Sequence, residues 1–269
     1  MKDVNNKKGL SQPKIRFNHY TGNNMEGEAF VSDHIFSYII SGTHDTWVGD
    51  KLYSFQAGDY RFFRRNQLTK YSKRPAQEGF KSIAVYIDQN TLKEISHEHG
   101  LTADTPYIGN DILLLKRNQY LERYIDSLMP YINSKNERNE KIVLLKAKEL
   151  ILLLLETNPA LKEMLFDFSD PGKINLEAFM NTHYRYNVGI DRFAFLTGRS
   201  LSGFKRDFEK LFNTTPGKWL VQKRLEEAHY LIAKKNKRPS EIYLDLGFLD
   251  LSHFSFAYKK AFGTAPTRG

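Results

Sequence analysis

Residues 201–216 read LSGFKRDFEKLFNTTP, and residues 251–266 read LSHFSFAYKKAFGTAP. These stretches decide the fold of the last third of the chain, because one matches the other at an offset of 50 residues. The identities occupy Leu196, Leu201, Ser202, Phe204, Lys210, Phe212, Thr214, Pro216 and the positions 50 residues later. A match of this density predicts that one small helical unit is built twice.

Each copy has the pattern of a helix-turn-helix. In the first copy, a short helix over 190–196 precedes Gly198 as the turn residue, and a second helix covers 200–212; its counterpart covers 250–262. Helical spacing predicts inward faces formed by Leu201, Phe204, Phe208, Leu211 and Phe212, and by Leu251, Phe254, Tyr258, Ala261 and Phe262. It predicts outward faces formed by Ser202, Lys205, Arg206 and Glu209, and by Ser252, Ser255, Phe256 and Lys259.

The outward faces suit DNA, since an α-helix fits the major groove and Arg or Lys can donate to guanine O6 and N7. Arg206 and Lys205 are the strongest candidates for reading bases. Phe256 is unusual on an outward face, where it would either contact thymine methyl groups or be half-buried. His253 is equally suited to a base or to a phosphate.

The segment from Pro216 to about Lys234 joins the two units. Its apolar residues Trp219, Leu220, Leu225, Ala228 and Leu231 are in helical register, and it contains no glycine after Gly217. A helix of this length is roughly 28 Å long, and successive major-groove faces lie about 34 Å apart. One continuous helix would therefore hold two recognition helices in adjacent turns of one DNA face.

Positive charge is concentrated in the same region. The chain of 269 residues has a net charge of +9, and residues 173–269 hold 17 Lys and Arg against 9 Asp and Glu, a net charge of +8. A basic domain joined to a nearly neutral one is typical of a nucleic-acid binder with a regulatory module. The alternative is a chance surplus of solvated lysines.

The first third of the chain is rich in β-forming residues. Short runs alternate with turn residues over 15–88, namely IRFNHY, EAFVSDHIFSYII, DTWV, KLYSF, YRFF and FKSIAVYI. Gly49-Asp50 lies between two of them and is typical of a tight hairpin. Six or more short strands predict a small barrel or sandwich.

Helical periodicity follows the strands. We expect a short helix over 89–99 that ends at Gly100, helical spacing from Leu113 to Ile132, and a long helix over about 137–156. The long helix has more leucines than one buried stripe needs, so it either packs on the barrel alone or also forms a homodimer seam. Residues 168–172 are predicted to be an interdomain linker.

The C-terminal hundred residues resemble the DNA-binding domain of the AraC/XylS family of bacterial transcription regulators. The resemblance rests on the two helix-turn-helix units, the connecting helix, the FEKLFNTTP block at 208–216 and the LGF…YKKAFGTAP pattern at 246–266. It implies a sequence-specific regulator that binds double-stranded DNA, forms a homodimer and contacts RNA polymerase. The implied DNA contacts are Ser200, Ser202, Lys205, Arg206, Leu251, Ser252, His253, Phe256 and Lys259.

Two departures from the family pattern matter. Family members often carry a basic or amide residue at the position of Phe256, so the second unit is expected to contribute affinity more than specificity. The chain also ends at Gly269, before the aromatic residue that commonly follows the final proline.

The N-terminal half resembles the family's cupin-like β-barrel with its dimerising helices. The expected fold is therefore an α+β multidomain protein with a cupin-like effector domain over 1–111, a helical dimerisation segment over 112–166, a linker over 167–173 and an all-α DNA-binding domain over 174–269. The candidates for an effector pocket, for a small molecule or a protein, are Tyr38, Trp47, Arg61 and Tyr86, which would otherwise belong to an ordinary core or surface. The strands lack the family's metal-binding His-x-His cluster, so no metal or cofactor is expected.

Other features exclude competing classes. Cysteine is absent, which removes disulfide scaffolds, thiolate zinc sites and cysteine nucleophiles, and the common nucleotide-binding and metalloprotease motifs are missing, so an enzyme is not expected. The longest apolar run, Leu150–Leu155, is too short for a membrane span, and the N-terminus lacks a signal-peptide pattern. We therefore expect a cytoplasmic, nucleoid-associated protein. The alternative function is a cupin-like ligand-binding or scaffold protein with only non-specific DNA affinity.

Overall fold

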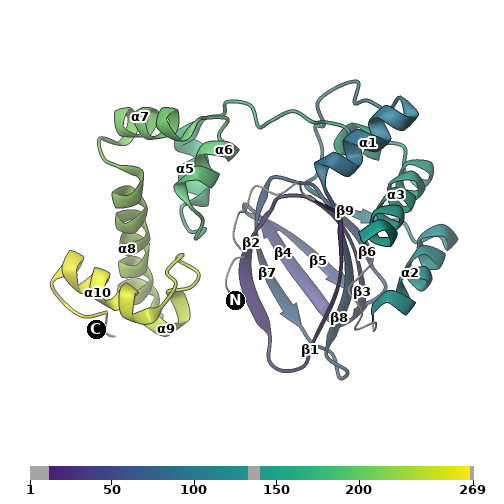
Figure 1. Ribbon diagram of the computed structural model, residues 1–269. Helices are drawn as coiled ribbons and strands as arrows, with labels where there is room; N and C mark the ends of the chain where they lie inside the picture. The colour runs from purple at the N-terminus through teal and green to yellow at the C-terminus, as the bar shows by residue number, and fades with distance from the viewer. Residues whose placement is uncertain (1–11, 133–139, 267–269) are drawn as a thin grey trace. The chain divides into compact units, whose positions relative to one another are not determined.

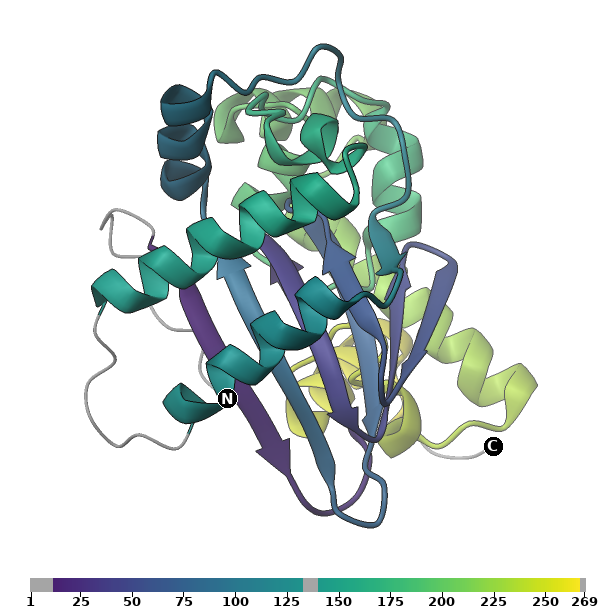
Figure 2. The same ribbon diagram turned by 90° about the vertical axis from the view of Figure 1, so that its right-hand side faces the viewer.

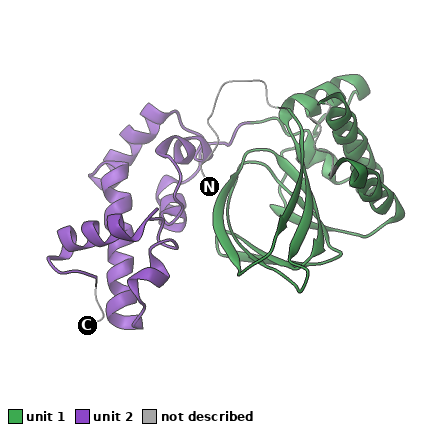
Figure 3. Ribbon diagram, turned by 60° about the horizontal axis from the view of Figure 1, so that its bottom comes forward, with its two compact units in different colours: residues 1–169 green, residues 170–269 purple. Residues whose placement is uncertain are grey.

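The computed structural model describes residues 12–132 and 140–266. The chain divides after Ser169 into two compact units, which are coloured separately in Figure 3. The N-terminal unit combines antiparallel sheets with helices, and the C-terminal unit is helical (Figure 1). The expected α+β multidomain fold is thus confirmed.

The strands of the N-terminal unit form two antiparallel sheets. Their order is β1-β8-β3-β6-β9 in the five-stranded sheet and β2-β7-β4-β5 in the four-stranded sheet. The strands are β1 (Lys14–Tyr20), β2 (Met25–Val31), β3 (His34–Ser41), β4 (Thr43–Val48), β5 (Lys51–Gln56), β6 (Tyr60–Phe63), β7 (Gln67–Arg74), β8 (Phe80–Ile87) and β9 (Ile112–Leu115).

Side-chain alternation gives this unit two apolar layers. One layer lies between the two sheets and contains Val31, Ile39, Phe55, Phe63, Phe80 and Ile112. The other covers the outer face of the five-stranded sheet, where residues such as Phe36, Phe62 and Val85 meet the helices. The unit is therefore a barrel with a helical layer against one side.

Four helices form that layer: α1 (Gln89–His99), α2 (Gln119–Ile132), α3 (Glu140–Thr157) and α4 (Leu161–Leu165). Figure 2 shows α2 and α3 side by side across the sheet, and the Tyr124 hydroxyl joins them by donating to the Lys146 carbonyl at 2.9 Å. The Asp88 side chain caps the start of α1, and Gly100 ends it with φ 63°, as the sequence predicted.

The sequence interpretation of the strands needs three corrections. The run over 28–40 contains the parts of two strands, β2 and β3, on either side of Ser32-Asp33. Strand β7 was missed because its polar sequence, QLTKYSKR, does not alternate clearly. Leu113–Leu115, predicted to begin a helix, pair with β6 as β9, and α2 starts only after Asn118, whose side chain accepts from the Leu121 amide at 3.0 Å.

The surplus leucines of α3 divide between core and surface. Leu150 and Leu154 are buried against the sheet, whereas Leu145 is 65% exposed and Leu152 is also exposed. The predicted residues 137–139 of this helix lie outside the described part of the chain.

The C-terminal unit consists of α5 (Leu176–His183), α6 (Ile190–Leu196), α7 (Leu201–Phe212), α8 (Pro216–Lys235), α9 (Pro239–Ile242) and α10 (Leu251–Phe262). The expected long helix is α8, and Figure 1 shows it between the first group of helices and the second. Its first half packs against α7 through Trp219, whose ring lies 4.8 Å from that of Phe212. Its second half shares a core with α9 and α10 through Leu225, Ala228 and Ile232.

The predicted inward faces are narrower than expected. In α7 only Phe204 and Phe208 are buried, while Leu201 and Leu211 are exposed. In α10 only Phe254 and Tyr258 are buried, and Leu251, Ala261 and Phe262 are exposed. The flanking apolar positions of α7 and α10 therefore lie at the rim of each small core.

Candidate nucleic-acid interface

Helix α7 presents polar and basic side chains to solvent. Its N-terminus is capped by Ser200, whose Oγ accepts from the Gly203 amide at 3.1 Å, and its C-terminus ends at Asn213 in the left-handed conformation. Because Phe204 and Phe208 are buried, the opposite face is exposed at Ser202, Lys205 and Arg206. The first turn of α7 can therefore enter a groove with donors facing the bases.

Helix α10 is built in the same way with different chemistry. Asp250 caps it by accepting from the His253 amide at 2.6 Å, and Gly263 ends it at φ 77°. Ser252, His253 and Lys259 are exposed. The Phe256 side chain is 70% exposed, so the alternative that it is half-buried is wrong.

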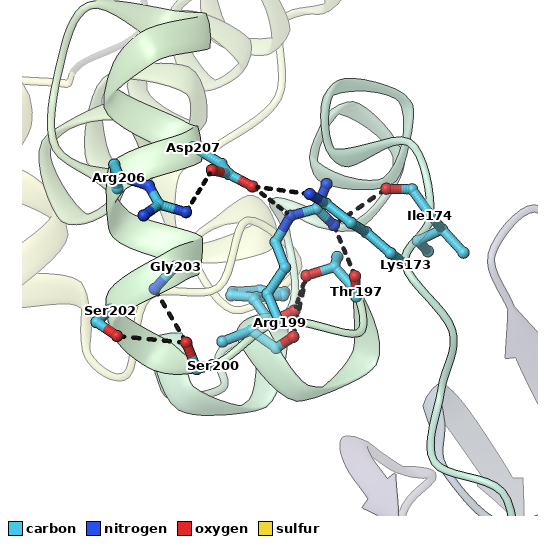
Figure 4. Close-up of polar contacts among 11 residues, drawn as sticks. Lys173, Ile174, Thr197, Arg199, Ser200, Ser202, Gly203, Arg206 and Asp207 are labelled. Atoms are coloured by element: carbon cyan, nitrogen blue, oxygen red, sulfur yellow. Dashed lines mark hydrogen bonds and ion pairs between the residues drawn. The ribbon is translucent and has the colours of Figure 1, made fainter.

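An ion-pair network surrounds the turn of the first unit (Figure 4). Arg199 Nε donates to Asp207 Oδ2 at 3.1 Å, and Arg199 Nη1 donates to the Ile174 and Thr197 carbonyls at 3.0 and 2.6 Å. Lys173 Nζ lies 3.6 Å from the same carboxylate. These contacts join α7, the turn before it and the segment entering the unit.

Asp207 also contacts a predicted base reader. Arg206 Nη2 lies 3.6 Å from Asp207 Oδ1, although 70% of the Arg206 side chain remains exposed. The hydrogen bond from Arg199 lowers the pKa of Asp207, and the nearby charges of Lys173 and Arg206 lower it further. The carboxylate therefore stays ionised and can orient Arg206 before any base is contacted.

Within the C-terminal unit, one buried arginine on α8 joins the two helix-turn-helix units. Arg224 Nε donates to the Tyr184 carbonyl at 2.7 Å and Nη2 donates to the Tyr186 carbonyl at 2.9 Å, both after α5. Its Nη1 donates to the Gly247 carbonyl in the second turn at 3.0 Å. A single guanidinium thus satisfies carbonyls from both units.

The nine predicted DNA contacts lie in two groups at the ends of α8. Ser200, Ser202, Lys205 and Arg206 share the start of α7, and Leu251, Ser252, His253, Phe256 and Lys259 share α10. Ser200 also has a structural role as the cap of α7. Sequence reasoning missed Arg199, Asp207, Arg224 and Asp250. Only Asp250 had a local signal, an acidic residue three positions before the amide that it caps.

Only two of the four predicted pocket residues, Arg61 and Tyr86, lie near each other inside the barrel. Arg61 Nη2 donates to the Ser37 hydroxyl at 3.3 Å, and the Arg61 guanidinium carbon lies 5.1 Å from the ring of Phe55 in the other sheet, which places Arg61 between the sheets. Burial lowers the pKa of Arg61, and the nearby Tyr86 side chain opposes this shift. Tyr38 follows Ser37 directly and packs against Tyr60 in the helical layer, with ring centroids 4.6 Å apart.

Trp47 is likewise on the wrong face for a pocket inside the barrel. It pairs with Lys70 across the strands and follows Thr46, which faces inward together with Tyr71. Strand alternation, which depends on the observed register, separates the four candidates. The register therefore places Arg61 and Tyr86 on inner faces of the sheets and Tyr38 and Trp47 on outer faces, and the effector role of these residues stays a prediction.

In residues 12–132 and 140–266, no group of three or more His, Asp or Glu side chains is arranged to hold a metal ion. None of the helices in these ranges is long and apolar enough to cross a membrane.

Two family models match the chain. Residues 34–164 match the ExsA N-terminal regulatory domain, and residues 193–268 match a helix-turn-helix domain. The first range covers most of the barrel and its helices, and the second covers both helix-turn-helix units from α6 onward.

Individual proteins are also similar to the chain. The chain is 23% identical over 243 residues to the thermoregulatory protein LcrF of Yersinia pestis, covering 86% of this chain and 87% of that one. It is 27% identical over 135 residues to the HTH-type transcriptional regulator ExsA of Pseudomonas aeruginosa, where the match spans about half of either chain (49%). An apo structure of a ToxT variant from Vibrio cholerae aligns over 97% of both chains with 10% identity and a TM-score of 0.47.

Proposed function

We propose that this chain, which belongs to the AraC family of transcription regulators with a regulatory N-terminal domain and a helix-turn-helix DNA-binding domain, places α7 and α10 in two successive major grooves. The observation that carries the proposal is the placement of two capped helices, each with an exposed polar first turn, at the ends of α8. The 20 residues of α8 span about 30 Å, close to the roughly 34 Å between groove faces.

The two helices would have different roles in DNA recognition. Lys205 and Arg206 carry the donors that suit guanine, and Ser202 can bond to any base edge. On α10 the exposed Phe256 fits the thymine methyl group, while His253 and Lys259 suit bases or phosphates. We therefore assign sequence reading mainly to α7 and affinity mainly to α10.

The N-terminal unit would regulate and assemble the protein. We assign the effector role to the barrel, which extends to Leu115 because β9 belongs to its sheet. The helical layer of α2 and α3 is proposed as a homodimer seam, supported by the exposed apolar residues Met129, Tyr131, Leu145 and Leu152. Size-exclusion chromatography with light scattering should then give twice the monomer mass at micromolar concentration, and a strict monomer would reject the seam.

Further roles follow from the family. As a transcription regulator the chain would contact RNA polymerase and act in the cytoplasm on the nucleoid, without catalysing a reaction of its own. The relatives are transcription regulators, which supports this role.

Selection of binding sites from a random duplex library tests the proposal, at about 150 mM salt so that counterion effects do not mask sequence preference. We expect an enriched motif with two short blocks about one helical turn apart. A single block would show that α10 holds the backbone only. Salt-sensitive binding without any enrichment would reject sequence-specific reading and favour the ligand-binding or scaffold alternative.

A further inference from the structure

The segment that leaves the N-terminal unit is held by an arginine of the barrel. Arg65 lies between β6 and β7 and is 6% exposed. Its Nη2 donates to the carbonyls of Asp167 and Ser169 at 2.8 and 2.9 Å. One guanidinium therefore fixes the backbone on both sides of Phe168, at residues that are 102 and 104 positions further along the chain.

Arg65 is itself held in place by its surroundings. Its backbone amide donates to His34 Nδ1 at 3.3 Å. Burial, followed by the charges of Arg65 and Arg64, lowers the pKa of His34 to about 3, so the ring is neutral and Nδ1 can accept. The side-chain oxygen of Gln89, in the amide orientation that satisfies both of its polar atoms, accepts from Arg65 Nε at 3.1 Å. The guanidinium thus has a defined direction toward the departing chain.

Aromatic contacts hold the same segment. Phe166 is 3% exposed and belongs to the core below the helical layer. The Phe168 ring packs edge-on against it with centroids 6.3 Å apart, and Lys93 Nζ lies 5.7 Å from the Phe168 centroid. The chain is therefore fixed to the N-terminal unit as far as Ser169.

The C-terminal unit holds the chain again from Gly172. A Cβ on Gly198 would lie 2.4 Å from the Gly172 carbonyl carbon, so the two backbones are in direct contact. Lys173 Nζ lies 3.6 Å from the Asp207 carboxylate of α7 (Figure 4). The first residues of this unit are thus fixed to its own turn.

Only Asp170 and Pro171 lie between the two fixed ends. Within residues 12–132 and 140–266 neither makes a hydrogen bond or an ion pair. We call the residues between the two fixed ends the tether. From Ser169 to Gly172 the tether can span at most about 10 Å, whereas from Phe166 to Gly172 it could span about 21 Å.

We propose that Arg65 sets the length of the tether between the regulatory unit and the DNA-binding unit. With its two hydrogen bonds in place the tether has two residues, and without them it has five, since the next fixed residue is Phe166. Hydrogen bonds from a charged guanidinium are stronger than neutral ones, and Pro171 restricts one of the two remaining residues. The barrel therefore limits the positions that the C-terminal unit can reach.

The length of the tether does not depend on the proposed function, but its consequence for DNA binding rests on it. A released tether would extend the reach of the DNA-binding unit by about 10 Å, which corresponds to roughly three base pairs. Arg65 would thus restrict where the regulatory unit allows the two recognition helices to bind.

Time-resolved fluorescence anisotropy of the full chain tests the tether. The chain has no cysteine, so a dye on Lys234→Cys, at an exposed position of α8, reports the motion of the C-terminal unit alone. Arg65→Met should raise the amplitude of the fast component about twofold or more. Inserting Gly-Ser-Gly between Asp170 and Pro171 adds as many residues as the release would free, and it should give the same increase.

Arg123→Met is the matched control, on a side chain that is 85% exposed on α2, and it should keep the amplitude of the parent. An increase with the insertion but none with Arg65→Met would overturn the proposal. So would equal amplitudes in all samples, because the tether would then not limit the motion. A lower Tm of Arg65→Met with an unchanged amplitude would show that Arg65 only supports the fold.

Arg65→Lys is the second variant if Arg65→Met does not fold, because it keeps the buried charge and loses the fork of donors. Its amplitude should lie between those of the parent and the insertion variant. Chymotrypsin gives an independent measurement, since it cuts after Phe168. Well below the Tm, either Arg65 variant should be cut there about tenfold faster or more than the parent, and an equal rate would overturn the proposal.

DNA binding is measured separately on the same samples. A lengthened tether in the Arg65 variants, together with no sequence-selective binding by the parent, would reject the proposed function and leave the role of Arg65 standing. Sequence-selective binding with an unchanged tether would do the opposite.

Discussion

The two helix-turn-helix units of this chain share a core and differ on the surface. At an offset of 50 residues, Phe204 and Phe254 are both fully buried, and so are Phe208 and, nearly so, Tyr258. The same offset pairs Arg206 with Phe256 on the outer faces. Packing within the unit therefore keeps the inner positions alike, whereas the outer positions are free to take different roles.

The units also differ in how their turns are held. In the first, an ion pair between the largely buried side chains of Arg199 and Asp207 connects the turn to α7. In the second, the buried Arg224 on α8 holds the turn at Gly247 and Asp250 caps the helix. The first unit thus has structural ion pairs next to its predicted base readers, and the second has its structural contacts away from its outer face.

The largest effect should come from breaking the link between the units. Arg224→Ala leaves three buried carbonyl groups without their donor, and we expect it to lower the free energy of unfolding of the C-terminal unit by about 4 kcal/mol. Chemical denaturation measures this loss, and DNA binding by both units should fail together. Arg185→Ala, on a side chain that is 47% exposed, is the control and should cost less than about 1 kcal/mol.

The close packing of the turn in the first helix-turn-helix unit can be tested by substituting alanine for each of two glycines. Gly198 has φ 65°, and a Cβ there would lie 2.4 Å from the Gly172 backbone carbon. Gly198→Ala should therefore cost about 2–3 kcal/mol through combined strain and overlap. Gly263 has φ 77° and no atom within 4 Å of such a Cβ, so Gly263→Ala should cost only about 1 kcal/mol. Equal losses in thermal unfolding would contradict the packing of Gly198 on the linker.

The difference between the outer faces is tested by Arg206→Ala and Phe256→Ala. Loss of Arg206 should cost about 1–3 kcal/mol at the preferred site and relax one base position. Loss of Phe256 should cost about 1 kcal/mol and relax at most a thymine preference. Binding to a library of single-base variants of the selected site separates the two. A uniform loss across that library for Arg206→Ala would make Arg206 a phosphate contact.

The smallest effect concerns Lys259, one of the two lysines in the last turn of α10. If Lys259 contacts phosphate, Lys259→Ala should weaken binding to every sequence alike and reduce the slope of log binding constant against log salt concentration by about 1. Titrations at several salt concentrations measure the slope. A change in base preference with an unchanged slope would make Lys259 a base reader and bring the second unit closer to the first.

Much of the C-terminal unit could be predicted from the sequence. The repeat at 50 residues, the turn glycine Gly198 and the apolar spacing of Phe204 and Phe208 are local signals, and they located α6 and α7 within one residue, whereas α5 and α9 were not predicted. The same helical spacing put Phe256 on the outward face, but only the structure showed that it is exposed and not half-buried. These predictions succeed because a helix is determined by residues three and four positions apart.

Tertiary structure alone decided which groups meet. Arg224 is one basic residue among many in the sequence, and only the approach of Tyr184, Tyr186 and Gly247 makes it a clamp. In the barrel, alternation depends on the register of strands far apart in the chain, so the sequence could not separate Arg61 from Trp47. Burial is a property of the assembled sheets, because it depends on what the other strands place around a side chain. The sequence by itself indicated the family, the repeated unit and its outer faces. Only the fold brought His44, Arg61 and Lys73 together inside the barrel.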